Sequence, residues 1–248
     1  MNKKIGIIGL GNLGLSLGGV LLMKGYRLRF IDKNEYLKIK DLEAVFLTVP
    51  DKVLPEVVEA IYSLPSDYIE NKIFIHCAGS LGVEFMEKLR QKGGWVGLFH
   101  PVQSFPYVIP QNFQNFYALF CGDKPVLNFL KELFSGLNIN IIEVEEKEID
   151  WVLYHLSCFI SSGLIVELFK NALYFLKKSG IKENPEKILL PLLKTTIKNI
   201  EILGVHSASS GPHVRKDFET IKKHIEKLKE ISPDFLSVYE KLLKLKKE

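Results

Sequence analysis

Lys3-Lys4-Ile5-Gly6-Ile7-Ile8 runs directly into Gly9-Leu10-Gly11-Asn12-Leu13-Gly14, and this stretch decides the fold. The first segment has the apolar character of a buried parallel strand. The second has GxGxxG spacing and opens an apolar helical stretch that lasts to about Lys24. Its glycines permit a tight turn, a close approach to a pyrophosphate and close helix–strand packing. The stretch therefore predicts a strand, a phosphate-binding turn and a helix whose N-terminus faces a diphosphate.

An acidic residue follows where a ribose would lie. Residues 27–31 predict a second strand, and Asp32 stands at its end. A carboxylate there hydrogen-bonds the ribose 2′-hydroxyl of NAD and repels the 2′-phosphate of NADP. We therefore expect NAD or NADP as the cofactor, with NAD favoured, although the neighbouring Lys33 offers a charge that a phosphate would bind. The alternative is a glycine turn with an unrelated acid downstream.

Alternating strand and helix patterns continue through the first half of the chain. The further predicted strands cover 44–49, 72–76, 95–99, 116–121 and 138–144. The predicted helices between them cover 51–62, 83–91 and 125–134. Repeated β-α units predict an α/β fold with a doubly wound, mostly parallel sheet. We expect a dinucleotide-binding Rossmann domain over 1–146 and a helical substrate and dimerisation domain over 147–248, joined at the acidic segment 143–150.

Ligands of such sheets bind at the carboxyl ends of the strands. Several predicted strands end in residues suited to that role. Together with the glycine turn, the expected cofactor-binding residues are Gly9, Gly11, Asn12, Leu13, Gly14, Asp32, Thr48, Val49, Pro50 and His76.

Two histidines are candidates for proton transfer. Hydride transfer to a carbonyl or imine needs a proton donor near the substrate heteroatom. His100 follows a predicted strand, and His155 lies near the start of the long helix of the second half. We predict that one of them is the donor; the alternatives are a histidine that caps a turn and a satisfied core histidine. The residues expected to hold the substrate are Gln103, Ser104 and Arg215. Arg215 would do so by clamping a substrate carboxylate.

The second half begins with a long apolar helix. From 147 to 178 the chain is apolar on nearly every side of a helix and contains no proline. Such a helix is buried all round. A chain of this size seldom encloses a helix of about 30 residues by itself. We therefore expect a homodimer whose second copy covers it; the alternative is a helix wrapped by its own domain.

Capping and breaking residues divide the rest of the helical half. Asn184, followed by Pro185, marks the start of a helix, and Gly204 marks its end. Asp217 is expected as the N-cap of the next helix rather than as a catalytic acid. The last two helices separate near 232–233.

Composition places the chain among ordinary globular proteins. It has 248 residues, 47% hydrophobic and 25% charged, with a formal net charge of +4. Because the basic residues near the C-terminus alternate with acids at helical spacing, we interpret them as a solvated helix face and expect no nucleic-acid partner. The stretch 5–23 imitates a signal peptide or membrane anchor, but its glycines divide it into a strand and a helix. We expect no membrane partner.

The positions of the cysteines and histidines indicate the cellular compartment and whether a metal is bound. Cys77, Cys121 and Cys158 lie far apart without CxxC spacing, as in proteins of a reducing compartment, and we expect the cytoplasm. The histidines near the C-terminus form no convincing ligand set with carboxylates, so no metal is expected.

Several motifs, taken in order, resemble one family. They are the glycine turn 9–14, Val49-Pro50-Asp51, His76-Cys77-Ala78-Gly79, the segment 100–105, Tyr154-His155, Asn199, Gly211-Pro212, Arg215, Asp217, Thr220 and His224. Together they resemble the Rossmann-like proteins with an uncharacterised helical C-terminal domain, distant relatives of 6-phosphogluconate dehydrogenase. The likeness covers nearly the whole chain. Ser210 and Lys216 replace a usual threonine and glycine, and Gly163 stands where the long helix usually has asparagine.

The resemblance implies an all-helical, dimerising C-terminal domain of the 6-phosphogluconate dehydrogenase type and an oxidoreductase activity without a settled substrate. It adds Asn199, Ser210 and Gly211 to the expected substrate-binding residues. The chain is also more distantly similar to ketopantoate reductase, pyrroline-5-carboxylate reductase and prephenate dehydrogenase, which makes ketopantoate one candidate substrate.

Two hypotheses about function follow. The first is a reductase or dehydrogenase that transfers a hydride between a nicotinamide dinucleotide and a small acid bearing a carbonyl or imine. The second is a non-catalytic dinucleotide-binding module that senses the cofactor or scaffolds a partner, since a fold carries function only through its site.

Overall fold

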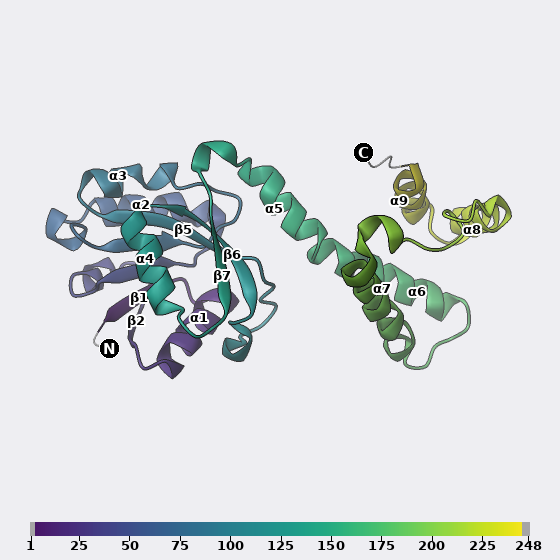
Figure 1. Ribbon diagram of the computed structural model, residues 1–248, viewed down its shortest axis with the longest axis horizontal. Helices are drawn as coiled ribbons and strands as arrows, with labels where there is room; N and C mark the ends of the chain where they lie inside the picture. The colour runs from purple at the N-terminus through teal and green to yellow at the C-terminus, as the bar shows by residue number, and fades with distance from the viewer. Residues whose placement is uncertain (1–2, 245–248) are drawn as a thin grey trace. The chain divides into compact units, whose positions relative to one another are not determined.

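The computed structural model describes residues 3–244, and a seven-stranded sheet organises the N-terminal part (Figure 1). The strands are β1 Lys4–Ile8, β2 Arg27–Ile31, β3 Ala44–Leu47, β4 Ile73–His76, β5 Trp95–Pro101, β6 Phe116–Gly122 and β7 Ile139–Glu143. Their order is β2-β1-β3-β4-β5-β6-β7. Neighbouring strands are parallel except β5 and β6, which are antiparallel. This is the mostly parallel, doubly wound α/β sheet that the sequence predicts.

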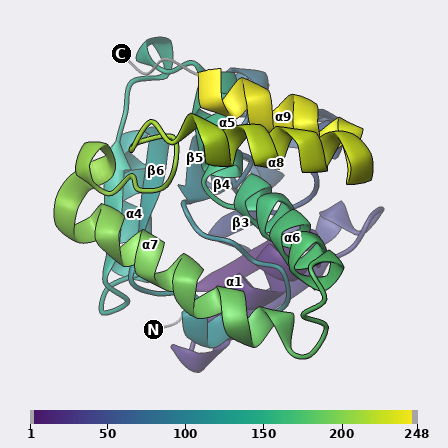
Figure 2. The same cartoon turned by 90° about the vertical axis from the view of Figure 1, so that its right-hand side faces the viewer.

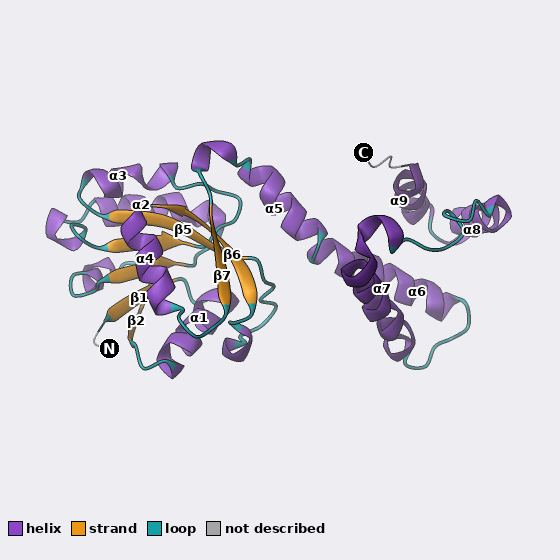
Figure 3. Ribbon diagram, in the orientation of Figure 1, coloured by secondary structure: helices purple, strands orange, loops and turns teal. Residues whose placement is uncertain are grey.

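Helices cover both faces of the sheet, as Figure 3 shows by colour. They are α1 Asn12–Met23, α2 Leu54–Tyr62, α3 Glu87–Gln91 and α4 Lys124–Leu133. Short 3₁₀ turns connect several elements: η1 Tyr36–Ile39, η2 Asp51–Val53, η3 Ser66–Tyr68, η4 Glu84–Met86, η5 Pro110–Asn112 and η6 Glu146–Glu148. Apolar residues of α1 and α4 pack in one core cluster, and those of α2 and α3 pack in the other.

The central strands are apolar without interruption because both of their faces are covered. In β3, Ala44 and Phe46 belong to one core cluster, while Val45 and Leu47 belong to the other. All four side chains are fully buried. Alternate residues of a strand point to opposite faces, so a strand between two helical layers has no polar face.

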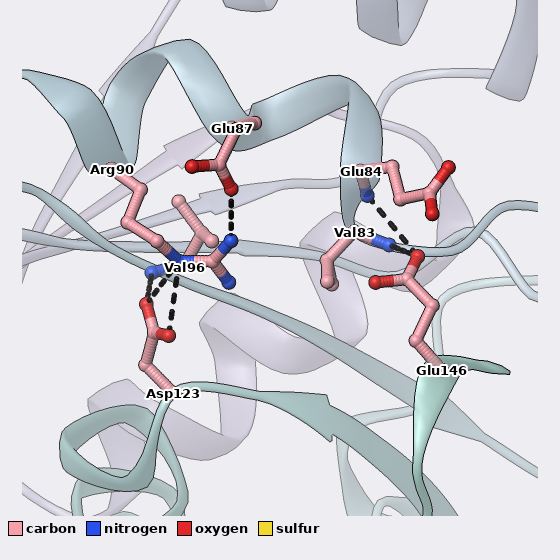
Figure 4. Close-up of polar contacts among 7 residues, drawn as sticks. All are labelled: Val83, Glu84, Glu87, Arg90, Val96, Asp123 and Glu146. Carbon is pink, nitrogen blue, oxygen red and sulfur yellow. Dashed lines mark hydrogen bonds and ion pairs between the residues drawn. The ribbon is translucent and has the colours of Figure 1, made fainter.

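Two carboxylates attach the η4–α3 segment to the sheet (Figure 4). Glu146 accepts hydrogen bonds from the backbone N–H groups of Val83, at 2.6 Å, and Glu84, at 3.1 Å. Asp123 accepts from the guanidinium of Arg90, at 3.1 Å, and from the N–H of Val96, at 2.8 Å. Glu146 therefore binds the free N–H groups at the start of η4, and its carboxylate does not cap α5, the helix that follows it in sequence.

The long apolar segment of the second half is two helices, α5 Trp151–Ile160 and α6 Gly163–Lys178. The prediction of one helix from 147 to 178 is wrong at its start, where Asp150 caps α5 by accepting the N–H of Leu153 at 2.9 Å. It is also wrong at its centre, where a turn separates the two helices. A Cβ atom on Gly163 would lie 2.4 Å from the Phe159 ring, so a larger residue at the start of α6 would require the exposed ring of Phe159 to move.

The apolar side chains of α5 and α6 are exposed in the single chain, so the predicted burial by a second copy stays a prediction. Val152 is 70% exposed and Val166 53% exposed. By length and composition alone the stretch Trp151–Lys178 could cross a membrane, with a mean hydropathy of 1.7 over its most apolar 18 residues. The same properties suit a helix that another chain covers.

The chain divides into two compact units between Val166 and Glu167, within α6. The second unit continues with α7 Pro185–Ser207, α8 Phe218–Ile231 and α9 Pro233–Lys244. Figure 2 shows α8 and α9 lying side by side. The functional boundary predicted at 146–147 stays a prediction.

The helix boundaries of the second unit test the predicted caps. Asp217 caps α8 by accepting the N–H of Thr220 at 3.1 Å, as predicted. Gly204 interrupts the helical backbone with a φ of 74°, also as predicted. Asn184 is the N-cap residue of α7 and Pro185 begins the helix, as predicted, but Asn184 has a left-handed φ of 48° and its side chain makes no capping hydrogen bond.

Candidate functional site

The glycine turn between β1 and α1 is shaped by two different demands. Gly9 has a φ of +105°, and a Cβ atom there would lie 2.6 Å from the backbone of Thr48. A Cβ on Gly14 would lie 2.1 Å from the carbonyl oxygen of Gly9. A Cβ on Gly11 would meet nothing within 4 Å. The fold itself needs Gly9 and Gly14, whereas the open space at Gly11 suits the approach of a ligand to the backbone.

The N-terminus of α1 has the properties of an anion site. Gly11 is the N-cap residue and offers no side-chain cap, and the first turn of α1 holds no acidic residue. The turn is held in shape by the Thr48 hydroxyl, which donates to the carbonyl of Gly9 at 2.7 Å. The first-turn N–H groups and the positive end of the helix dipole are therefore available to phosphate oxygens.

Most predicted cofactor residues lie around this turn. Leu13 is half-buried against the core, Val49 follows Thr48, and Pro50 precedes η2. Asn12 donates its side-chain amide to the carbonyl of Phe105 at 3.1 Å, which ties the loop after β5 to the start of α1.

Asp32 follows β2, the strand beside β1, and is exposed. Its carboxylate accepts the N–H of Lys33 at 2.7 Å. A second carboxylate lies close, because Glu35 is 3.4 Å from the N–H of Asp32. The end of β2 therefore carries negative charge, with Lys33 paired to Glu56 at 3.3 Å.

His76 differs from the other predicted cofactor residues because its side chain is fully buried. The ring meets the edge of Phe85, with 5.0 Å between centroids, and neither ring nitrogen has a hydrogen-bond partner among residues 3–244. Burial lowers the pKa of His76 to about 3. The imidazole is therefore a neutral group of the core at the carboxyl end of β4.

His100, near the end of β5, lies beside helix α5. Its Nδ1 shares a hydrogen bond of 2.5 Å with the hydroxyl of Tyr154, and its ring centroid is 6.5 Å from that of His155. A Cβ on Gly79 would lie 2.6 Å from Nε2 of His100, so the glycine after β4 makes room for the ring. The structure thus brings the two predicted catalytic histidines together and adds Tyr154, which site prediction from sequence missed.

Electrostatics make the His100–Tyr154 pair neutral at neutral pH. Burial, and then the nearby charge of His155, lower the pKa of His100 to about 4, against the opposing effect of Asp51. Burial raises the pKa of the Tyr154 phenol above its ordinary value. Asp51 itself accepts a hydrogen bond from the hydroxyl of Ser80.

These residues line a hollow of about 650 Å³. Its walls are His100, Pro101, Val102, Gln103, Ser104, Tyr154, His155, Ser157, Cys158, Phe159, Ser161 and Ser162. Gln103 and Ser104, predicted to hold the substrate, both belong to it, and the side-chain oxygen of Gln103 accepts the N–H of Ser104 at 2.9 Å. A volume of this size suits a small organic ligand.

The other predicted substrate residues lie in the second compact unit. Asn199 is part of α7, and Ser210 and Gly211 belong to the loop between α7 and α8. Gly211 has a φ of +114°, a conformation that favours glycine. Arg215 is exposed in the same loop.

The described part of the chain has no cluster of metal ligands, and two of its three cysteines are buried. Within residues 3–244, no group of three or more histidine, cysteine or acidic side chains is placed to hold a metal ion. Burial raises the pKa of Cys77 to about 12 and that of Cys121 to about 11, so both thiols are protonated at neutral pH.

Comparison with known proteins gives the family. The model of a domain of unknown function, DUF2520, matches residues 116–245, which is more than half of the chain. The chain belongs to the DUF2520 family. No curated protein matches this DUF2520 chain in sequence.

Solved structures share the fold of this DUF2520 protein. A Bacteroides fragilis protein described as a candidate NADP oxidoreductase has 21% identity and a TM-score of 0.76, covering 98% of this chain and 96% of that one. A reductive aminase from Aspergillus terreus, in complex with NADPH and ethyl levulinate, has 12% identity and a TM-score of 0.72, with coverages of 98% and 93%. An imine reductase from Bacillus cereus has 14% identity and a TM-score of 0.65, with coverages of 98% and 92%. At these identities the likeness is one of fold: a Rossmann-type sheet followed by a helical C-terminal part.

Proposed function

We propose that this DUF2520 protein is an oxidoreductase that reduces a carbonyl or imine group of a small molecule with a nicotinamide dinucleotide. The observation that carries the proposal is the open glycine turn at the N-terminus of α1, where Gly11 leaves room that the fold does not need. The hollow around His100 gives a small substrate a place in the same unit. The proteins named above, one of them holding NADPH, support the oxidoreductase class.

The residues of the first unit divide the work. The backbone of 9–14 and the first turn of α1 would hold the diphosphate, and Asp32 would hold the adenosine ribose. When bound, the reduced nicotinamide supplies a hydride. His100 and His155, with Tyr154 beside them, would contact the group that is reduced, and Gln103 with Ser104 would orient it.

Three finer statements belong to the proposal. Because carboxylates surround the end of β2, NAD is preferred over NADP. The exposed apolar residues of α5 and α6 are covered by a second copy, so the protein is a homodimer. The protein is cytoplasmic, as its widely separated cysteines fit a reducing compartment.

The test is dinucleotide binding by Gly11→Val, measured by calorimetry. The added side chain fills the space reserved for the diphosphate, so affinity falls by tenfold or more, about 1.4 kcal/mol. The melting temperature stays within about 2 °C of wild type, because a Cβ at Gly11 meets no protein atom within 4 Å. Gly14→Ala is the contrasting variant: its Cβ collides with the Gly9 carbonyl, so it loses stability as well as binding.

Two outcomes contradict the proposal. If wild-type protein binds neither NAD nor NADP, the dinucleotide site is wrong. If Gly11→Val binds as tightly as wild type, the glycine turn is not the diphosphate site. Tight binding without oxidation of reduced cofactor by any of a panel of 2-oxo acids, ketones and cyclic imines would favour the sensor hypothesis.

A further inference from the structure

The hollow beside His100 has walls without formal charge. Among the twelve residues that line it there is no lysine, arginine, aspartate or glutamate. The carboxylate of Asp51 acts electrostatically on His100 and accepts a hydrogen bond from the hydroxyl of Ser80. A carboxylate or phosphate would find no lysine or arginine to pair with among these residues, so the site favours a cationic ligand over an anionic one.

Serines of α5 and of the turn that follows it line this hollow. The hydroxyl of Ser157 donates to the carbonyl of Leu153 at 2.9 Å, and that of Ser162 donates to the carbonyl of Cys158 at 2.7 Å. Each hydroxyl has one proton, so what remains to a ligand is the lone pairs of its oxygen. Acceptor oxygens bind N–H groups, and they bind cationic N–H groups most strongly.

His100 and Tyr154, which lie in the wall of this hollow, are poor proton donors. With a pKa of about 4, about one His100 ring in a thousand is protonated at pH 7. Tyr154 keeps its proton because burial raises its pKa, and donation would leave a phenolate in a hollow that has no lysine or arginine to stabilise it. His155 is exposed and also lines the hollow, with its ring centroid 6.5 Å from that of His100. An alkoxide formed from a carbonyl beside His100 and Tyr154 would not readily take a proton from either of these two residues.

Resting on the reductase function proposed above, we propose that the group reduced beside His100 and Tyr154 is a protonated C=N bond, an iminium, of an amine-type substrate that carries no acid into this hollow. The iminium carbon gains the hydride, its π electron pair returns to nitrogen, and a neutral amine results. No proton is transferred in that step, because the substrate arrives with it. The serine oxygens and the neutral His100–Tyr154 pair bind the N–H and orient the carbon.

The proposal is tested first by binding alone. Three probes of one size are titrated at pH 7 by calorimetry, with and without NAD: piperidine, which is cationic, cyclohexanol, which is neutral, and cyclohexanecarboxylate. We expect piperidine to bind at least tenfold more tightly than either of the others. Cyclohexanol or the carboxylate binding as tightly, or no probe binding at all, overturns the proposal.

A matched pair of variants locates the probe. Ser161 is exposed, lines the hollow and makes no side-chain hydrogen bond in the described chain, so the fold tolerates a longer residue there. Ser161→Lys adds a cation and is expected to weaken piperidine binding by tenfold or more, while Ser161→Gln, of similar length, changes it less than threefold. Equal effects of the two variants would place the amine elsewhere.

Turnover separates this inference from the function on which it rests. With reduced cofactor, 1-piperideine is expected to be reduced at least a hundredfold faster than cyclohexanone. Faster reduction of the ketone refutes the iminium inference while the reductase function stands. Absence of dinucleotide binding refutes the reductase function, and the amine titration of the cofactor-free protein still decides whether the hollow selects cations.

Discussion

The burial of His76 makes the free energy of unfolding depend on pH. Its ring is fully buried and has no hydrogen-bond partner of regular geometry within residues 3–244, so burial disfavours a charge on it more than the backbone of Gly82 favours one. In the unfolded chain a histidine takes up a proton near pH 6.5, whereas His76 in the folded chain does so at about pH 3. Between these values the unfolded state binds more protons, so the free energy of unfolding falls as the pH falls.

We predict that His76→Leu flattens this pH dependence. Urea unfolding of the wild type should lose stability from pH 6.5 toward pH 3, and His76 contributes about 1.4 kcal/mol for each pH unit within that window. The leucine variant lacks this contribution. His206→Leu, at an exposed position, is the control and should keep the wild-type slope. An unchanged slope in His76→Leu would show that the ring is not held neutral.

Asp32 is the residue that we expect to set the preference between NAD and NADP. Wild-type protein is expected to bind NAD at least tenfold more tightly than NADP, because a 2′-phosphate would face the carboxylates of Asp32 and Glu35. Asp32→Ser should narrow this ratio by about tenfold, roughly 1.4 kcal/mol, in calorimetric titrations. Asp41→Ser removes an exposed acid elsewhere and should leave the ratio unchanged. Tighter binding of NADP by the wild type would reverse the proposed preference.

At the scale of elements, helix α1 carries the loop that follows β5. The buried hydroxyl of Ser16 accepts the N–H of Ile109 at 2.9 Å, and a Cβ on Gly19 would lie 2.4 Å from Pro110. With the bond from Asn12 to the Phe105 carbonyl, these contacts fix the loop that begins with Gln103 and Ser104. The helix that would hold the diphosphate therefore also positions one wall of the substrate hollow.

Ser16→Ala is expected to lower the free energy of unfolding by about 1–3 kcal/mol, because the N–H of Ile109 loses its acceptor in a buried place. Amide hydrogen exchange in 102–113 should quicken in the same variant. Ser63→Ala is the matched control: its exposed hydroxyl donates to the Glu59 carbonyl one turn earlier and accepts nothing, so its loss costs less than about 0.5 kcal/mol. Equal costs in urea unfolding would mean that Ser16 does not hold the loop.

The sequence predicts elements that local patterns encode. The spacing of glycines in 9–14 predicts strand, turn and helix, and the structure has them there as β1 and α1. Contacts between distant segments leave no such pattern: Tyr154 reaches His100 only because the sheet places β5 beside α5. The turn before Gly163 could not be predicted either, since the apolar character of the sequence continues through it from α5 to α6.

For the whole molecule, the exposed apolar residues of α5 and α6 require an explanation. Val152 and Leu156 lie one turn apart on α5, 70% and 45% exposed, and water around such a surface is costly. A second copy of the chain would cover them without any other partner. We therefore expect light scattering of the purified protein to give twice the mass of one chain at micromolar concentration.

The double variant Val152→Glu, Leu156→Glu should raise the dissociation constant of this dimer by 100-fold or more, since burying each side chain contributes about 1.5–3 kcal/mol and each buried carboxylate is penalised. Neither residue lines the hollow beside His100, so loss of the dimer is separable from direct damage to its walls. Met23→Glu is the control, because it also replaces an apolar side chain that is 70% exposed, at the end of α1. It should leave the mass of the dimer unchanged. A monomeric wild type, or equal dissociation by Met23→Glu, would mean that α5 is not the dimer surface and that something other than a second copy covers it.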